Sequence, residues 1–298
     1  MLNRKFSPSK SRTNHSRDVS GNSEQRKTLM NEFKSIKELY KPIQPTIRIG
    51  NGTTYSEIKP TEQLSNFIYC YWQLKTEKPL TENFIYKVVT DGCMDIFWEV
   101  NTPNQNFITG FSNQYTEFPL ENKFNYFGIR FLPTAFPTLF KTDASELTNK
   151  FEDLNSVIPN LSKQLSQQTE GINSISNLKP VLDNYFNQQI NSKILKFDNR
   201  IFGAIELILK SQGTLSIEKD LNVGISSRQL RRLFNFYIGD TPKVFSKVVR
   251  FQSLLNGKPS TQSLRENKLY YDLGYFDQTH FIKEFKHLYG STPTKAFK

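Results

Sequence analysis

The sequence has few of the side chains that most enzyme and redox sites require. Its 298 residues include only 3 His, 3 Met and 2 Cys, and the two cysteines, Cys70 and Cys93, are too few for a disulfide framework. No run of eighteen apolar residues occurs, so we expect no membrane-spanning helix. The basic N-terminus is not followed by the apolar segment of a secretory signal. Together these features predict a cytoplasmic protein that does not associate with a membrane.

The histidines that are present lie outside the middle of the chain. His15, His280 and His287 all fall outside residues 46–197. This segment therefore cannot supply the histidine of a Ser-His or Cys-His catalytic pair, nor the usual His ligands of a catalytic metal site. We expect no catalytic residue, no metal and no cofactor, and we predict that the protein is not an enzyme.

Three carboxylates and one thiol remain as candidates for chemistry in the middle segment. Asp91, Asp95 and Glu99 are spaced by four residues and would share one face of a strand, although Asp91 lies in a "TDG" turn. Ordinary strand-edge and turn positions are the simpler explanation of these carboxylates. Cys93 is either a buried small thiol or the reactive group of a redox or alkylation sensor. Two alternatives to a simple regulator therefore stay open: a thiol-based stress sensor, and an enzyme with an appended nucleic-acid-binding domain.

Positive charge is abundant but unevenly distributed. The net charge is +11, and residues 198–298 carry 16 basic against 9 acidic side chains, whereas residues 46–197 carry 13 against 15. The first 45 residues hold 10 basic and 4 acidic side chains. A basic C-terminal third attracts polyanions at long range, although a merely soluble surface would have the same charge.

The pattern of apolar residues divides the chain into three parts. Residues 1–45 are predicted to be a basic, mostly disordered tail up to residue 26, followed by a short helix over 27–40. Residues 46–190 begin with short aromatic and β-branched runs between turn residues, as in a β-sandwich or barrel, and become helical after Pro133. Their aromatic residues are mostly core, but some could line an apolar ligand pocket. Residues 187–199 are predicted to be a linker, and residues 199–298 are helical.

The C-terminal part contains two units of similar design. In "VGISSRQLRRLFNFYIGDTP" (223–242), Gly224 makes a turn and Ser226 caps a helix. Its apolar stripe is Leu230, Leu233, Phe234 and Tyr237, and its polar side carries Arg228, Arg231, Arg232 and Asn235. Arginine can bind guanine with two hydrogen bonds, and the other side chains can reach phosphate.

The second unit, "DLGYFDQTHFIKEFKHLYGSTP" (272–293), follows the same plan. Asp277 caps a helix that Gly290 ends, and "LYYDLGY" before it reads as the end of another helix. The apolar stripe is Phe281, Phe285 and Leu288, and the opposite side carries Thr279, His280, Lys283, Lys286 and His287. Between the units, the pattern of residues 241–255 predicts a connecting helix that would hold the two reading helices at a fixed separation, facing two successive major grooves.

These motifs resemble the DNA-binding domain of the AraC/XylS family of transcription regulators, over residues 199–298. The resemblance implies sequence-specific binding of double-stranded DNA. Carried over by position, its base-contacting residues fall on Arg228, Arg231, Arg232, Thr279, His280 and Lys283, and Asn235 lies on the same exposed side. Asp277 and Gln278 would cap and brace the fold. The sequence departs from the family at Tyr270, where the family has a small residue, and in the first unit, which is one residue short.

Residues 58–165 resemble a poorly characterised N-terminal domain that is often fused to such regulators, through "LSNFIYCYWQL", "TDGCMDIFWEV" and "GIRFLPTAFPTLF". The combined prediction is an α+β protein of several domains. A β-rich sandwich or barrel with trailing helices would sense or dimerise, and an all-α domain of two helix-turn-helix units joined by a linker helix would bind DNA and act as an activator. A small-molecule effector, a second copy of the chain and RNA polymerase are the further candidate partners.

Overall fold

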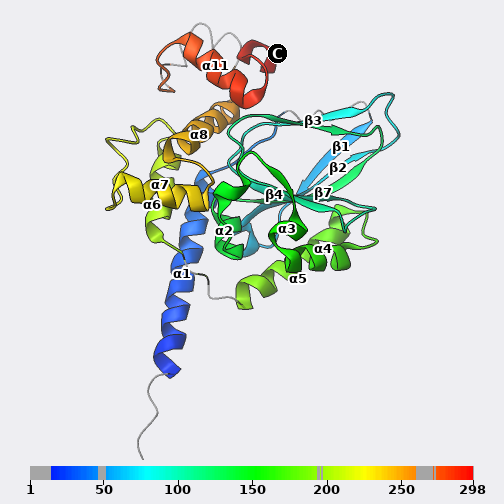
Figure 1. Cartoon of the computed structure of the whole chain (residues 1–298), viewed down its shortest axis with the longest axis horizontal. Coiled ribbons are helices and arrows are strands. Elements are labelled where there is room, and N and C mark those ends of the chain that lie inside the picture. Colours follow the sequence, from blue (N-terminus) through cyan, green and yellow to red (C-terminus); the bar gives the residue numbers. More distant parts are fainter. Residues whose placement is uncertain are drawn as a thin grey trace, which may run out of the picture.

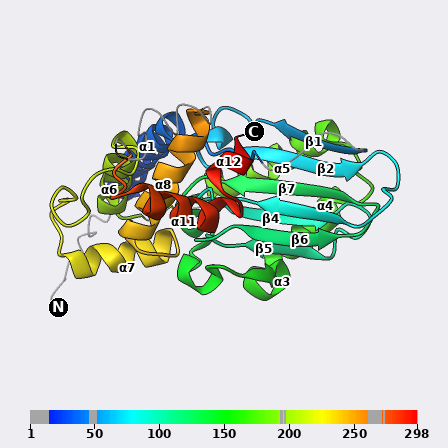
Figure 2. The same ribbon diagram turned by 90° about the horizontal axis from the view of Figure 1, so that it is seen from above.

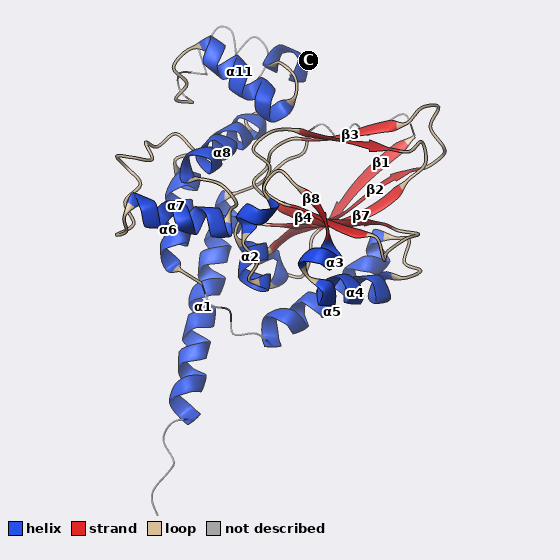
Figure 3. Cartoon of the chain, in the orientation of Figure 1, coloured by secondary structure: helices blue, strands red, loops and turns tan. Residues whose placement is uncertain are grey.

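A computed structural model describes residues 15–45, 52–192, 195, 197–259, 271 and 273–297 of the chain. A long N-terminal helix, a β-rich middle domain with helices on one side, and a helical C-terminal third are all in contact (Figures 1 and 3). None of the helices in these ranges is long and apolar enough to cross a membrane.

The middle domain contains two antiparallel sheets. Its strands in the described chain are β1 (Thr53–Ile58), β2 (Ile68–Thr76), β3 (Phe84–Val88), β4 (Met94–Glu99), β5 (Asn106–Thr109), β6 (Thr116–Leu120), β7 (Asn125–Phe131) and β8 (Phe151–Asp153). Six of them form one sheet in the order β1-β2-β7-β4-β5-β8, and β3 pairs with β6 in a second sheet. Figure 2 shows β1, β2, β7, β4 and β5 of the large sheet side by side. The large sheet stays open at β1 and β8, so of the two predicted architectures the sandwich-like one is confirmed.

The two faces of the large sheet have different neighbours. On one face Ile96, Trp98 and Phe127 are buried against helices, and Figure 1 shows α4 and α5 beneath the sheet. On the other face Trp72 and Leu74 pack towards the second sheet. The helices that follow the strands are α2 (Ala135–Phe140), α3 (Leu154–Val157), α4 (Pro159–Thr169) and α5 (Ile175–Ser192), with short 3-10 helices η1 (Leu64–Asn66) and η2 (Ala144–Leu147).

The N-terminal helix is longer than the sequence predicts. Helix α1 spans His15–Leu39, so the predicted disorder is wrong for residues 15–26, and residues 1–14 lie outside the described chain. The buried stripe of Leu29, Phe33 and Ile36 anchors its C-terminal half. Once those turns are fixed by packing, each further residue adds a hydrogen bond without a new nucleus, so a polar segment can continue the helix.

Helix α1 also joins the other two parts of the chain. The ring of Phe33 lies 4.5 Å from that of Phe67 in the middle domain and 5.0 Å from that of Phe202 in the C-terminal third. One continuous cluster of buried apolar residues runs through all three parts. Residues 1–45 therefore contribute to the core, and the predicted domain boundaries stay a prediction.

The C-terminal third contains the predicted reading helices and the helix between them. Its described helices are α6 (Asn199–Lys210), α7 (Ser227–Tyr237), α8 (Pro242–Asn256), α11 (Gln278–Tyr289) and α12 (Pro293–Ala296). Helix α5 runs to Ser192, inside the predicted linker. Of "LYYDLGY" (269–275), residues 269, 270 and 272 lie outside the described chain, and the departure at Tyr270 lies there with them. Tyr271 is helical, and Gly274 turns the chain with φ of 72°.

The first unit differs from the predicted helix-turn-helix. Between α6 and α7, residues 217–220 form only a turn, closed by the amide of Asp220 on the Ser216 carbonyl (2.8 Å) and the amide of Ser216 on the Asp220 carboxylate (2.9 Å). The first is the i to i−4 bond of a single helical turn, and in the second the Asp220 side chain satisfies the amide at the start of that turn. In the described chain, the turn at residues 217–220 therefore takes the place of the first helix of this unit.

Candidate DNA-binding surface and the cavity of the middle domain

Helix α7 presents its basic face to solvent, as its sequence predicts. The Ser226 hydroxyl accepts from the amide of Gln229 (3.3 Å) and the Gln229 side chain accepts from the amide of Ser226 (3.2 Å), which fixes the start of the helix. Leu230 and Phe234 are buried. The residues on the opposite side, Arg228, Arg231, Arg232 and Asn235, are all exposed. Arg232 lies at the edge of this group, in a hollow that it shares with Asp198 and Arg200.

Helix α11 is built in the same way. The Asp277 carboxylate accepts from the amide of His280 (2.7 Å), and Gly290 ends the helix with φ of 86°. Thr279, His280 and Lys283 are exposed, as are Lys286 and His287. His280 is also held by the protein, because its ring lies 5.5 Å from that of Tyr275 and its Nε2 lies 3.9 Å from the Glu284 carboxylate. Contacts within the protein therefore partly fix the position of the His280 side chain.

A buried ion pair that the sequence did not indicate fastens α11 to α8. The carboxylate of Glu284 lies 3.0 Å from Nη2 of Arg250 and 3.1 Å from Nζ of Lys247, both on α8. Arg250 also covers the ring of Tyr275, 4.2 Å from its centroid. Burial alone would raise the pKa of Glu284, but Arg250 and Lys247 together outweigh it and hold that pKa below its ordinary value. Glu284 is thus an ionised anchor between the connecting helix and the second reading helix.

Replacing Glu284 with Gln is expected to destabilise the protein by about 1.5–3 kcal/mol at pH 7, the range for a hydrogen bond to a charged group. Because the folded-state pKa of Glu284 is lowered, this stabilisation is complete above the unfolded pKa of about 4.3 and is lost as the pH falls through the folded value. Urea unfolding at pH 3–7 measures the difference between variant and wild type. His280→Gln removes a weaker partner of the same carboxylate and should change stability by less than about 0.5 kcal/mol. Equal losses of stability in the two variants would contradict the role of Glu284 as the anchor between α8 and α11.

A cavity of about 470 Å³ lies in the middle domain between the two sheets. Its walls include seven aromatic side chains, and its polar end is formed by Arg130 on β7. The side chain of Arg130 is buried, at 1% exposure. Nη2 of Arg130 donates to the Asp95 carboxylate at 2.8 Å, and its Nε lies 3.4 Å from Asp91. Burial raises the pKa of Asp95, although Arg130 acts in the opposite direction. Two of the three candidate carboxylates thus neutralise a buried arginine, and the third, Glu99, accepts hydrogen bonds in the Asn101 turn.

Sequence reasoning missed Arg130, although a signal was present. An arginine inside the apolar run "YFGIRFLP" must lose its water on folding, and a buried charge requires an opposite charge nearby. Gly128 on the same strand shapes the cavity wall, because a Cβ there would lie 2.0 Å from the Trp72 ring. Trp72 can therefore lie flat across β7, with its Nε1 donating to Asp95 at 3.0 Å.

The environment of the cysteines does not support the thiol-sensor alternative. Cys70 and Cys93 are both buried. Burial raises the pKa of the Cys93 thiol well above its ordinary value, and the carboxylate of Asp91 raises it further. The reactive thiolate is therefore scarce at neutral pH. The described residues also contain no cluster of three or more His, Cys, Asp or Glu side chains that could hold a metal ion.

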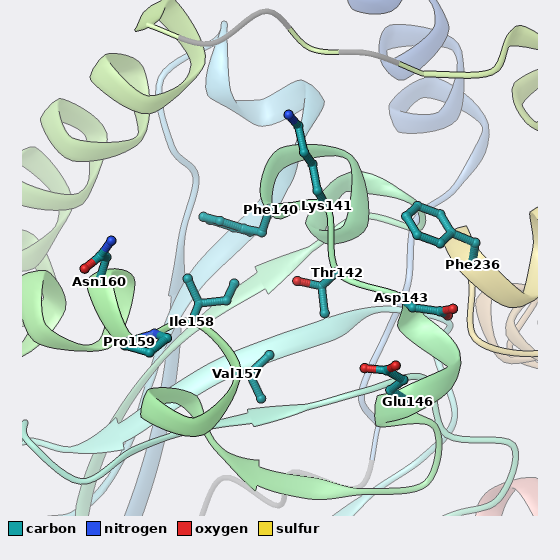
Figure 4. A pocket seen from close by; sticks show the side chains of 10 residues that line it. All are labelled: Phe140, Lys141, Thr142, Asp143, Glu146, Val157, Ile158, Pro159, Asn160 and Phe236. Carbon is teal, nitrogen blue, oxygen red and sulfur yellow. The ribbon is translucent and has the colours of Figure 1, made fainter.

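An open hollow lies where α7 meets the segment between α2 and α4 (Figure 4). Phe236 enters it from α7, opposite Phe140 and Ile158 of the middle domain. Asp143 also lines this hollow. Its carboxylate accepts hydrogen bonds from the amide and the hydroxyl of Ser145, at 2.9 and 2.7 Å. The hollow is thus a seam between the first reading helix and the middle domain, and Asp143 serves as a helix cap.

Comparison with known proteins matches two separate segments of the chain to two protein families. Residues 222–298 match the family described as "Helix-turn-helix domain", and residues 56–153 match the one described as "Domain of unknown function (DUF6597)". No curated protein matches the chain. Two solved structures of ToxT from Vibrio cholerae, one of them bound to (E)-4-(8-methylnaphthalen-1-yl)but-3-enoic acid, are 14% and 13% identical, with TM-scores of 0.34 and 0.35. Each alignment covers 82% of this chain and 97% of ToxT.

The C-terminal match covers both capped helices, their exposed basic faces and the motif "DQTHFIKEFKHLYG". The chain therefore carries an AraC-type helix-turn-helix domain, the DNA-binding domain of transcription regulators, at residues 222–298, with a DUF6597 domain in front of it.

Proposed function

We propose that a single chain contacts two successive major grooves through α7 and α11, and that the middle domain modulates this binding. The observation that carries the proposal is the pair of capped helices fixed to α8, each with a basic face in solvent. The proposed DNA-contacting residues are Arg228, Arg231, Arg232, Asn235, Thr279, His280 and Lys283. Of these, His280 is the weakest candidate because its ring also packs on Tyr275.

The proposed modulation is supported by direct contacts between α11 and the edge of the cavity. The amide of Thr90 donates to the Leu288 carbonyl at 3.4 Å, and the amide of Tyr115 donates to the His287 carbonyl at 3.1 Å. Gln252 on α8 is 1% exposed and donates to the Thr90 carbonyl at 2.7 Å. A change in the turn at Thr90 would therefore shift the C-terminal end of α11 relative to α8. Contacts of this kind let a bound effector favour one arrangement of the reading helices over another.

The full chain is expected to bind duplex DNA with an affinity that falls steeply with salt. Lysine and arginine side chains displace condensed counterions from the phosphates, so contacts to about six phosphates would weaken binding by about 1,000-fold between 50 and 200 mM salt. Fluorescence anisotropy with labelled genomic fragments, after selection of the tightest binders, measures the slope. Binding that is independent of salt, or absent for every fragment, would contradict the proposal.

A second copy of the chain and RNA polymerase are further proposed partners. Strand β1 stands at one end of the large sheet, and strands at sheet edges are sites where copies of a chain can pair. Light scattering of the full chain, with and without operator DNA, distinguishes a monomer that spans two grooves from a dimer that spans four.

A further inference from the structure

The cavity of the middle domain has the size and lining of a small-molecule site. Its volume of about 470 Å³ falls in the range of about 300–1,000 Å³ that is typical of ligand pockets. The rings of Phe107 and Phe151 stack 4.5 Å apart at one side, and Trp72 stacks on Phe97 at 6.3 Å. Phe151 is 46% exposed and so lies at the border between cavity and solvent. Such walls favour a flat, largely apolar occupant.

At the polar end, the acceptor oxygens already have protein donors. Both Asp95 oxygens accept from Arg130, and one of them also accepts from Trp72. One Asp91 oxygen accepts from the amide of Cys93 (3.0 Å), and the other accepts from the side chain of Gln44 (2.7 Å). The two carboxylates therefore have no oxygen that lacks a donor and could fix a cationic ligand, and the guanidinium beside them would repel one.

One donor in this cluster remains unsatisfied. Nη1 of Arg130 is buried and has no hydrogen-bond partner among the described residues, although Arg130 lines the cavity. The Tyr86 hydroxyl lies beside the guanidinium, which lowers the pKa of Tyr86 through its charge and by hydrogen bonding, but burial has the larger effect and that pKa is raised. Nη1 carries two N–H groups, so one hydroxyl does not satisfy both of them. A buried N–H without an acceptor is costly, so the cavity lacks a hydrogen-bond acceptor at this point.

The charges in the cluster decide which kind of acceptor fits. Asp91 and Asp95 already place two carboxylates against one guanidinium at the buried end, and Lys150, the other cation of the lining, is exposed to solvent. An anionic ligand at the buried end would therefore add a third negative charge there. We propose that the cavity binds an uncharged, largely aromatic or aliphatic compound whose carbonyl-type oxygen accepts a hydrogen bond from Arg130 Nη1. An effect of this compound on DNA binding rests on the proposed function, whereas its binding to the cavity does not.

Three probes with the same ring system test this chemistry on the full chain. They are 2-acetylnaphthalene, which has a neutral acceptor, 2-ethylnaphthalene, which has none, and 2-naphthoate, which is charged. Each is titrated to its solubility limit by calorimetry, with the shift in Tm as a second readout. We expect the ketone to bind about tenfold tighter than either of the other two, because a hydrogen bond to a charged donor is worth at least that factor.

A matched pair of variants locates the binding without touching the charged cluster. Val88 on β3 lines the cavity, so Val88→Trp should fill it and reduce ketone binding at least about tenfold. Ile85 lies on the opposite face of the same strand and is 54% exposed, so Ile85→Trp should leave binding unchanged. Equal effects of the two variants would contradict binding in the cavity.

Other outcomes separate the ligand from its regulatory role. Tighter binding of 2-naphthoate would overturn the neutral class, equal binding of 2-ethylnaphthalene would overturn the role of Arg130, and no stabilisation by the ketone would overturn the site, leaving a buried water as the partner of Nη1. DNA affinity is then measured with the ketone at saturation. Ketone binding that leaves DNA affinity unchanged would contradict the proposed modulation alone.

Discussion

Replacing Arg130 with Met is expected to destabilise the protein by about 3–5 kcal/mol at pH 7, the cost of removing one partner from a buried ion pair. The guanidinium is 1% exposed, and the carboxylates of Asp91 and Asp95 depend on it for neutralisation. Methionine has a similar length and no charge, so packing changes little while both carboxylates are left buried without a cation. Urea unfolding, followed by far-UV circular dichroism, measures the loss.

A double variant separates charge from packing. In Arg130→Met with Asp95→Asn, the nearest buried charge disappears together with its partner, and a neutral replacement of both members of a pair is often close to neutral in stability. We expect this variant to recover at least half of the loss. A loss of less than about 1 kcal/mol for Arg130→Met alone would show that water reaches the cluster and that the cavity has no buried polar end.

Removing the three arginines of α7 together is expected to abolish most sequence-specific binding. Arg228, Arg231 and Arg232 are exposed on the side of the helix opposite the buried stripe. Each Ala substitution that removes a hydrogen bond to a base costs about 1–3 kcal/mol, so the triple variant should bind its operator about 100-fold more weakly or worse. The slope of affinity against salt should also fall, by about 0.9 for each phosphate that is no longer neutralised.

A control with the same loss of charge is available in the middle domain. Lys78, Lys123 and Lys163 are exposed there, outside both reading helices. Their combined replacement by Ala removes three positive charges from the long-range field and none of the proposed DNA-contacting residues, so affinity should change by less than about threefold. Comparable losses in the two triple variants would mean that net charge, and not the face of α7, determines DNA binding.

The parts of the fold that the sequence predicts well are those set by local signals. Ser226, Asp277 and Gly290 act within a few residues of their own position, and the structure confirms each of them as a helix boundary. The exposed faces of α7 and α11 follow from helical periodicity in the same way. These local signals were sufficient to find the candidate DNA-binding surface.

The features that could not be predicted depend on contacts between distant residues. Arg130 and Asp95 are 35 residues apart and meet only because β7 and β4 pair. Glu284 and Arg250, which form the buried ion pair, are 34 residues apart and lie on two different helices. Likewise, Phe33 of α1 packs on Phe67 of the middle domain and on Phe202 of the C-terminal third, both distant in the sequence. No periodicity or composition within one segment carries this information.

Footprinting on the selected operator shows whether α7 and α11 of one chain enter successive major grooves. Wild type, Arg231→Ala and Lys283→Ala are compared, because these side chains lie on the exposed faces of α7 and α11. We predict that each substitution weakens protection of a different half-site, with the two centres about 10–10.5 base pairs apart. Loss of protection at the same few base pairs in both variants, or unchanged protection in both, would contradict the two-groove arrangement.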